Sequence, residues 1–235
     1  EIQRLLESIP PREAYYPGAG DRIQQAQDSY PGAVNASKGT PRVLITDLDA
    51  SAAEACFTDE YFTTVLGETP LTANSPADFL RKAVVFANEQ LEGTLGASIL
   101  VDPKTAKALG DELENAIDDL RYGAIAINLW SGVAFLLAEC AWGGVAGQPE
   151  DDVQSGIGFV HNAYLFNKVE KSVVRGSFYS YPRGWLHGDF AILPKPPWFV
   201  TNKTGHITGK RVTYFATDPS PLHLPGIFAS ALRGM

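Results

Sequence analysis

The sequence is poor in the residue types on which most thiol and metal chemistry depends. Its 235 residues include two cysteines, one methionine and four histidines. Two cysteines cannot form a disulfide framework, which favours a reducing compartment, so we expect a cytoplasmic protein. The histidines have no metal-ligand spacing, and we interpret each as a surface or packing residue. They are His161, His187, His206 and His223.

Basic charge and long apolar runs are also scarce. The chain has 19 Lys and Arg against 27 Asp and Glu, a net charge of -8. Binding to nucleic acid requires a basic surface, so a nucleic-acid partner is not expected. The nearest candidate for a membrane span, residues 132–147, is broken by Glu139 and by glycines, and no signal peptide is visible. We therefore expect no membrane partner.

No common catalytic motif is present either, since the chain lacks a P-loop, a Gly-x-Ser-x-Gly elbow and a complete Gly-x-Gly-x-x-Gly. Cys56 is close in sequence to Glu54, Asp59 and Glu60, and nearby acids raise the pKa of a thiol. Cys140 directly follows an acid within an apolar run. We interpret both cysteines as buried structural residues. A catalytic Cys56 is the alternative, and rapid alkylation at neutral pH would reveal it.

What the sequence does contain is an alternation of strand and helix patterns, which predicts an α/β fold with a layered, mostly parallel sheet and flanking helices. Ser75-Pro76 and Asp102-Pro103 each combine a capping residue with a proline suited to the first helical position. Apolar stripes at helical spacing follow both pairs. The predicted strands are residues 41–48, 63–71, 95–102, 122–130 and 162–174.

The two ends of the chain differ from this pattern. Residues 1–11 have helical spacing without a preceding cap and without an initial Met, so we expect the chain to be part of a longer protein. From residue 175 onward the sequence is rich in proline and aromatic residues, which predicts an irregular extension packed on the rest. The predicted organisation is therefore residues 1–174 as one domain and residues 175–235 as a C-terminal extension.

Six short motifs occur in an order that resembles the C-terminal part of the catalytic domain of NAD(P)-dependent aldehyde dehydrogenases. The resemblance covers roughly residues 41–174, and each motif alone is weak. The motifs are Glu60-Tyr61-Phe62, Phe86-Ala87-Asn88, Gly93-Thr94-Leu95-Gly96-Ala97-Ser98, Gly123 to Asn128, Trp142-Gly143-Gly144, and Ser155-Gly-Ile-Gly158 followed by Glu170-Lys171-Ser172-Val173. Thr63-Thr64 replaces the usual Gly-Pro, and residues 148–153 lengthen one loop.

The resemblance implies roles for five residues. Glu60 would accept hydrogen bonds from the hydroxyls of the nicotinamide ribose of NAD or NADP, and Phe62 would pack near the nicotinamide ring. Val133, Phe135 and Trp142 would line the aldehyde pocket. The strand within Tyr164 to Val174 would contribute to a homo-oligomer interface.

In that family the nucleophilic cysteine, the general-base glutamate and the Rossmann-like cofactor domain lie upstream of the acid–x–Phe motif. None of the 59 residues before Glu60 supplies them. We therefore expect the isolated chain to be inactive, although part of an enzyme that oxidises an aldehyde to a carboxylic acid. The alternative is a non-catalytic interaction or oligomerisation module on the same α/β scaffold. The aldehyde, and the choice between NAD and NADP, stay open.

Overall fold

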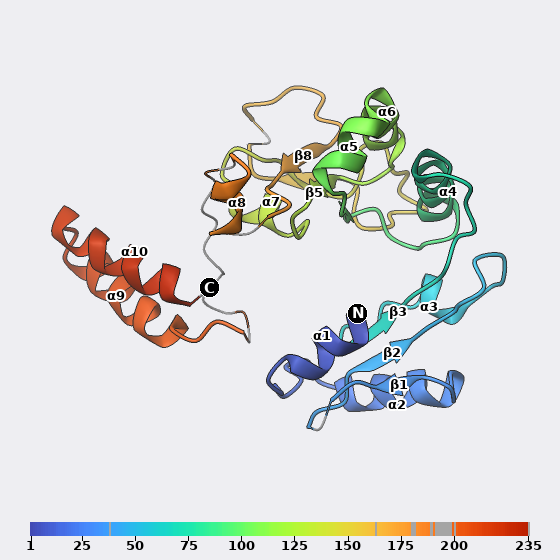
Figure 1. The fold of residues 1–235 in the computed structure, drawn as a ribbon, viewed down its shortest axis with the longest axis horizontal. Coiled ribbons are helices and arrows are strands. Elements are labelled where there is room, and N and C mark those ends of the chain that lie inside the picture. Colours follow the sequence, from blue (N-terminus) through green and yellow to red (C-terminus); the bar gives the residue numbers. More distant parts are fainter. Residues whose placement is uncertain are drawn as a thin grey trace. The chain divides into compact units, whose positions relative to one another are not determined.

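The computed structural model describes residues 1–37, 39–162, 164–179, 182–188, 190, 199 and 201–234. The chain, whose helices and strands are labelled in Figure 1, divides into two compact units. Unit 1 consists of Glu1–Asp47, Tyr61–Glu68 and Ile192–Met235, and unit 2 consists of Leu48–Glu60 and Thr69–Ala191. The predicted boundary at residue 174 falls inside unit 2, and that division of the chain stays a prediction.

Unit 2 is built on a three-stranded parallel sheet. Its strands are β4 (Gly96–Ile99), β5 (Ala124–Ile127) and β8 (Ser172–Arg175), in the order β4-β5-β8. The central strand, β5, is buried along its whole length, which is typical of a parallel strand covered on both faces. The predicted mixed α/β class with a parallel sheet is thus confirmed for this unit.

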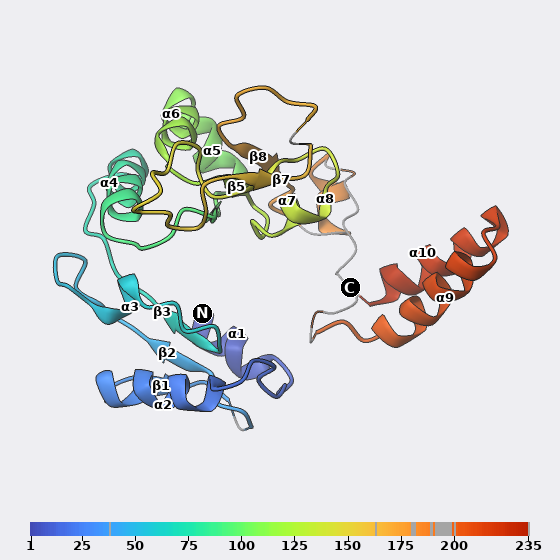
Figure 2. The same ribbon diagram turned by 180° about the vertical axis from the view of Figure 1, so that it is seen from behind.

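Three helices cover one face of this sheet (Figure 2). They are α4 (Pro76–Glu89), α5 (Pro103–Leu109) and α6 (Asp111–Asp119). Ile125 and Ile127 of β5 pack in one core cluster with Leu80 of α4 and Ile117 of α6. Since side chains alternate between the faces of a strand, Ala124 and Ala126 point to the opposite face, and both are buried.

The starts of the helices agree with the sequence signals. The Ser75 hydroxyl accepts a hydrogen bond from the Asp78 N–H at 3.1 Å, and Pro76 occupies the first helical turn. The Asp102 carboxylate accepts hydrogen bonds from the N–H groups of Lys104 and Thr105. The side chain of Thr105 first, and its backbone N–H second, hold the pKa of this carboxyl below its usual range. Both predicted caps are confirmed.

The opposite face of the sheet carries the short helix α7 (Val133–Leu136) and a two-stranded ribbon of β6 (Trp142–Gly143) and β7 (Phe159–Val160). The ribbon approaches the start of β5 so closely that a side chain would not fit there. A Cβ on Gly123 would lie 2.0 Å from the carbonyl oxygen of Gly143. The glycine is therefore required by packing between these two backbones.

The N-terminal part of unit 1 contains α1 (Ile2–Ser8), α2 (Ala19–Ser29), β1 (Val34–Asn35), β2 (Val43–Ile45) and β3 (Val65–Gly67). Strand β2 pairs antiparallel with β1 and parallel with β3. The buried guanidinium of Arg42 donates hydrogen bonds to the carbonyl oxygens of Leu6, Ile9 and Pro10. The predicted N-terminal helix is confirmed, and Arg42 ties its carboxyl end to β2.

Two sequence predictions were wrong. The extension is not irregular throughout, because it contains α8 (Arg183–Leu186), α9 (Gly205–Thr217), a 3₁₀ turn η1 (Pro221–His223) and α10 (Leu224–Arg233). The last two helices pack on one another as a hairpin. The strand predicted for residues 162–174 is limited to β8, because Asn162 and Lys168 have positive φ angles that an extended strand excludes.

The helices are all short. Among the residues that the structure describes, none is long and apolar enough to cross a membrane.

Candidate functional site

Glu60 follows a short helix, α3 (Ala55–Thr58), that is fixed within unit 2. Phe57 of this helix is buried edge-to-face against Phe86 of α4, with ring centroids 5.0 Å apart. The Phe57 carbonyl oxygen also accepts a hydrogen bond from the Glu92 N–H at 2.8 Å. These two contacts fix the helix that precedes Glu60, whose own side chain is exposed at the rim of a cavity.

The facing wall is the loop that leads into β4, and a distant segment of the chain holds it in place. The N–H of Gly93 donates to Oε1 of Gln154, and the N–H of Thr94 donates to Oγ of Ser155, both at 2.8 Å. Gly93 has a φ of +95°, a conformation that a residue with a Cβ rarely adopts. The loop is thus shaped by a glycine and anchored by two side chains 61 residues away.

These segments enclose a cavity of about 630 Å³ at the amino ends of β4 and β5, which we call the acidic cavity. That volume is in the range of small-molecule sites. Its lining consists of residues from α3 and the turn after it, the loop before β4, the start of β5 and the Gln154-Ser155 segment. They are Cys56, Phe57, Thr58, Asp59, Glu60, Leu91, Glu92, Gly93, Leu95, Gly96, Tyr122, Gln154 and Ser155.

The charge of the acidic cavity is of one sign. Asp59, Glu60 and Glu92 contribute carboxylates, and among the lining residues that the structure describes there is no lysine, arginine or histidine. Carboxylates accept hydrogen bonds from hydroxyl groups and attract cations, whereas phosphate needs donors and positive charge. The cavity is therefore suited to a ligand that presents hydroxyls or a cationic ring, and unsuited to a phosphate group.

Tyr122 forms part of the wall and takes no acid–base role. Its hydroxyl donates to the carbonyl oxygen of Ala87 at 2.9 Å. Burial raises the pKa of this phenol, and the opposing effect of Arg121 is smaller. The hydroxyl therefore stays protonated and is already engaged by the backbone of α4.

The two cysteines lie in unit 2. Neither forms a disulfide, and both are half-buried rather than fully buried as predicted. Burial raises the pKa of the Cys140 thiol, and the charge of Glu139 raises it further, in the predicted direction. Cys56 lines the acidic cavity beside Asp59 and Glu60. In the described part of the chain, no group of three or more His, Cys, Asp and Glu residues could hold a metal ion.

Phe62, predicted to pack near a nicotinamide ring, belongs to unit 1 while Glu60 belongs to unit 2. Its ring lies edge-to-face against Tyr16, with centroids 5.4 Å apart, and its φ is +47°. The side chain is largely exposed. The two residues predicted to bind the cofactor, Glu60 and Phe62, therefore belong to different units, and the contacts of each are those within its own unit.

Two of the three residues predicted for the substrate pocket come together in unit 2. The rings of Phe135 and Trp142 lie 5.7 Å apart in an edge-to-face arrangement. His161 joins them at 5.0 Å from Phe135, a partner that the sequence did not associate with this group. Val133 shares the helix α7 with Phe135. The ribbon of β6 and β7 explains this cluster, because Trp142 pairs with Val160, the neighbour of His161.

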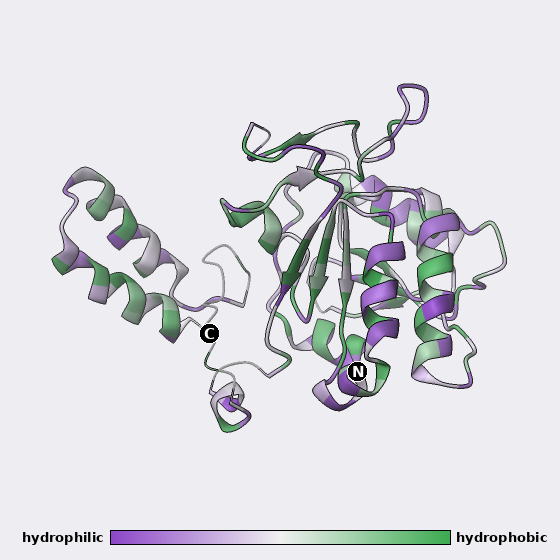
Figure 3. Cartoon of the chain, turned by 90° about the horizontal axis from the view of Figure 1, so that it is seen from above, coloured by the Kyte–Doolittle hydropathy of each residue, from purple (hydrophilic) through white to green (hydrophobic). Residues whose placement is uncertain are grey.

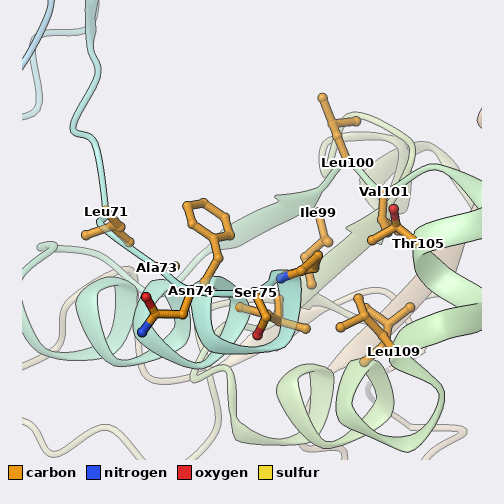
Figure 4. A pocket seen from close by; sticks show the side chains of 13 residues that line it. Leu71, Ala73, Asn74, Ser75, Ile99, Leu100, Val101, Thr105 and Leu109 are labelled. Atoms are coloured by element: carbon orange, nitrogen blue, oxygen red, sulfur yellow. The ribbon is translucent and has the colours of Figure 1, made fainter.

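A second cavity of about 470 Å³ lies at the other end of β4, and we call it the apolar cavity (Figure 4). The residues that follow β4, the start of α4, and helices α5 and α6 form its walls. Its lining is Leu71, Ala73, Asn74, Ser75, Pro76, Phe79, Leu80, Ile99, Leu100, Val101, Thr105, Leu109 and Leu113. None of these side chains titrates near neutral pH, so the apolar cavity offers no acid–base chemistry.

Comparison with known proteins gives no relative from which a function could be transferred. No family model matches the chain, and neither a curated protein nor a solved structure matches it.

Proposed function

We propose that this chain forms the nicotinamide-ribose side of the site of an NAD(P)-dependent aldehyde dehydrogenase, with Glu60 as the ribose acceptor. The proposal rests on the resemblance of six ordered motifs. It extends the observed α/β class to the catalytic-domain fold of that family. In this proposal the nucleophilic cysteine and the adenine-binding domain are supplied by residues that are not among these 235.

One observation carries the proposal, namely that residues from three of the six motifs line the same cavity. Glu60 belongs to the acid–x–Phe motif, Gly93 and Gly96 to the Gly-Thr-Leu-Gly-Ala-Ser motif, and Ser155 to the Ser-Gly-x-Gly motif. The hydrogen bonds of Gly93 and Thr94 to Gln154 and Ser155 join two of these motifs directly. Segments up to about 95 residues apart in sequence therefore meet around Glu60, as a shared ligand site would require.

The chemistry of the acidic cavity supports the nicotinamide end of the cofactor rather than its pyrophosphate. A carboxylate on Glu60 can accept hydrogen bonds from both hydroxyls of a ribose. The other two acids, Asp59 and Glu92, would favour the oxidised nicotinamide ring, which carries a positive charge. By holding the ribose, Glu60 would orient the ring toward an aldehyde, and the cofactor itself would supply the hydride chemistry.

The aldehyde side of the proposal involves the cluster around α7. Val133, Phe135 and Trp142 are proposed to contact the substrate, with His161 supporting the ring of Phe135. An apolar and aromatic wall of this kind would shield the bound aldehyde from bulk water before hydride transfer, whereas the later hydrolysis of the thioester needs one water molecule to enter. The residues of the chain would thus bind and orient the substrate, without taking part in bond formation.

Binding of nicotinamide riboside to the chain tests the role of Glu60 without requiring turnover. The ligand carries the ribose and the cationic ring but no phosphate, and chemical-shift changes in NMR spectra would report its binding. We expect Glu60→Gln to weaken binding about tenfold or more, because two charge-assisted hydrogen bonds are lost. The matched control is Glu92→Gln, which removes the same charge from the same cavity and should have a smaller effect.

Equal losses in the two variants would show that only the charge of the cavity matters and would contradict the assignment of Glu60. Absence of binding at millimolar ligand would contradict the proposed function itself. The proposal also predicts that the chain alone forms no NAD(P)H when it is incubated with aldehydes and NAD(P). Turnover by these 235 residues would show that the nucleophile is within them.

A second candidate function, oligomerisation, is favoured by the position of β8 at an edge of the described sheet. The N–H of Ser172 donates to the carbonyl oxygen of Gly123, directly before β5, and the N–H of Gly176 donates to Ile127 of β5. Because N–H groups alternate in direction along a strand, the N–H of Val173 points away from β5. An edge strand of this kind can pair with another chain. We expect Val173→Pro to lower the mass measured by light scattering from an oligomer to a monomer. An unchanged mass would exclude pairing through β8.

A further inference from the structure

The hairpin of α9 and α10, which we take as residues 201–234, is joined by polar contacts. Thr208 is the buried residue of α9, and Ser230 is the buried residue of α10. Their hydroxyls are hydrogen-bonded at 3.1 Å, and the Thr204 hydroxyl donates to the Ser230 carbonyl oxygen at 2.6 Å. The Arg211 guanidinium donates to the carbonyl oxygen of Gly226. Hydroxyl and backbone groups thus occupy the seam where a water-soluble helix pair usually places apolar side chains.

Several apolar side chains of the hairpin are exposed, whereas Phe215 and Ile227 are half-buried. Leu224, Phe228 and Leu232 follow one another at intervals of four residues, which places them on one face of α10, and they are 36%, 60% and 37% exposed. Leu222, in the turn before α10, is 87% exposed, and Tyr214 of α9 is 60% exposed. Figure 3 shows hydrophobic residues along both helices. The exposed apolar residues on one face of α10 mark an interaction surface.

The charge of the hairpin is opposite to that of the rest of the chain. Residues 201–235 contain four Lys and Arg residues and one Asp, which gives a net charge of +3. Residues 1–200 contain 15 Lys and Arg residues and 26 Asp and Glu residues, which gives a net charge of -11. One of these cations, Lys210, lies with its Nζ 5.9 Å from the ring centroid of Tyr214. Basic and aromatic groups are therefore adjacent on α9. This combination is complementary to a surface that presents anionic groups above an apolar layer.

The dimensions of the hairpin decide how it would meet such a surface. Helix α10 has 10 residues, which corresponds to a length of roughly 15 Å, about half the thickness of the hydrocarbon core of a bilayer. The helix is too short to span a membrane and suited to lie along its surface. Binding at the surface also leaves the polar seam between the helices intact.

We propose that the hairpin, residues 201–234, binds the surface of bilayers that contain anionic phospholipids. Leu222, Leu224, Phe228 and Leu232 enter the boundary between headgroups and acyl chains, and Lys210 contacts lipid phosphates. Salt screens the repulsion between the acidic remainder of the chain and the lipid beyond about 8 Å at physiological ionic strength. This inference is independent of the proposed enzymatic function, and it departs from the sequence-based expectation of no membrane partner.

Cosedimentation of the full chain with lipid vesicles tests the proposal. Two preparations are compared, one of phosphatidylcholine alone and one in which about a third of the lipid is phosphatidylserine. We expect the chain to sediment with the anionic vesicles, at least about fivefold more strongly than with the neutral ones, and less as salt is added. Phe228→Asp should reduce binding about tenfold or more, and Lys210→Gln should reduce it about fivefold on anionic vesicles alone.

The matched control is Leu100→Asp, which introduces the same charge at a 78% exposed leucine in unit 2. We expect this variant to bind vesicles like the unaltered chain, and circular dichroism should show equal helix content in all variants. Absence of vesicle binding, or equal losses in Leu100→Asp and Phe228→Asp, would overturn the proposal. So would a dimer, seen by light scattering, that Phe228→Asp dissociates while neither protein binds vesicles, since the hairpin would then bind a second copy.

Discussion

The parallel sheet of unit 2 and the hairpin of α9 and α10 bury opposite kinds of side chain. In the sheet, Ile125 and Ile127 are buried against the helices while charged residues lie outside. In the hairpin, Thr208 and Ser230 are buried while Phe228 and its apolar neighbours are exposed. The sheet is therefore stabilised mainly by removing apolar surface from water, whereas the hairpin buries hydrogen-bonded hydroxyl groups and leaves much of its apolar surface exposed.

This difference indicates which of the two regions is stabilised by contacts within itself. Burial of a large aliphatic side chain contributes about 1.5 to 3 kcal/mol, while a net hydrogen bond contributes about 1 kcal/mol. Unit 2 has a contiguous core in which ten residues are buried together. The hairpin has no comparable core among its described residues, so the apolar face of α10 gains most of its stabilisation from whatever covers it.

The largest expected effect is that of Ile125→Ala, in the centre of the sheet. Ile125 is fully buried, and removing its side chain leaves a cavity that the neighbouring strands cannot close. We expect a loss of about 3 kcal/mol in the free energy of unfolding, measured by urea denaturation. The matched change in the hairpin, Phe228→Ala, should cost less than about 0.5 kcal/mol. Similar losses at both sites would abolish the contrast between the two regions.

The next largest effect is expected at Lys171, where unit 2 places a cation at the carboxyl end of α6. The largely buried Nζ donates to the carbonyl oxygens of Ile117, Asp118 and Leu120 at 3.3, 2.6 and 2.8 Å. These carbonyls have lost their helical partners, and the helix dipole favours a positive charge there. Lys171→Met should lower the free energy of unfolding by about 2 kcal/mol.

The control for this prediction is Lys107→Met, which alters an exposed lysine in the last turn of α5. Its effect on urea denaturation should be within about 0.5 kcal/mol. If Lys171→Met lowered the free energy of unfolding as little as Lys107→Met, the polar contacts of Lys171 would stabilise unit 2 no more than a surface charge does. The contrast with the hairpin would then rest on apolar burial alone.

A smaller and local effect is expected within the hairpin. Thr208→Val keeps the shape of the side chain but removes its hydrogen bond to Ser230. We expect about 1 kcal/mol less protection from hydrogen exchange for the amides of α9 and α10, and no change for those of β5. Thr213→Val is the matched control, since the Thr213 hydroxyl is exposed and bonds only within its helix, to Gly209. Loss of protection in β5 would indicate that the hairpin and the sheet unfold together.

The same contrast explains which parts of the fold could be predicted from the sequence. Helix α4 and strand β5 carry local signals, a Ser-Pro start in one and an uninterrupted apolar run in the other, and both were predicted. The hairpin was missed because the α9 residues Val212 to Phe215 are β-branched or aromatic and favour strands when read locally. Its helices are joined by hydrogen bonds between residues 22 positions apart, which no local pattern reveals.

The candidate site shows the same limit. Glu60 was singled out through its motif, and Ser155 belonged to another motif, but only the fold brings the two to one cavity. Tyr122 and Gln154 were not predicted as its lining, because their positions depend on sheet register and on a loop anchor 61 residues away. His161 was interpreted as a surface or packing residue, and its ring contact with Phe135 agrees with the second of these interpretations.

The smallest expected effect concerns the thiol of Cys140, which unit 2 keeps half-buried. Burial first, and the Glu139 charge second, raise the pKa of this thiol, so the folded state favours its neutral form. The neutral thiol of Cys140 therefore contributes to the stability of the fold below the ordinary thiol pKa, and this contribution is lost as the pH rises through the raised pKa.

Alkylation at pH 8, followed by peptide mass spectrometry, measures the reactivity of this thiol. We expect Cys140 to be alkylated more slowly in the folded chain than in urea. Glu139→Gln should speed it about twofold, because only the lesser of the two causes is removed, whereas Glu150→Gln should leave it unchanged. If Glu139→Gln restored the alkylation rate seen in urea, the charge of Glu139 rather than burial would control the reactivity of Cys140. The apolar interior of unit 2 would then not extend as far as Cys140, beyond α7.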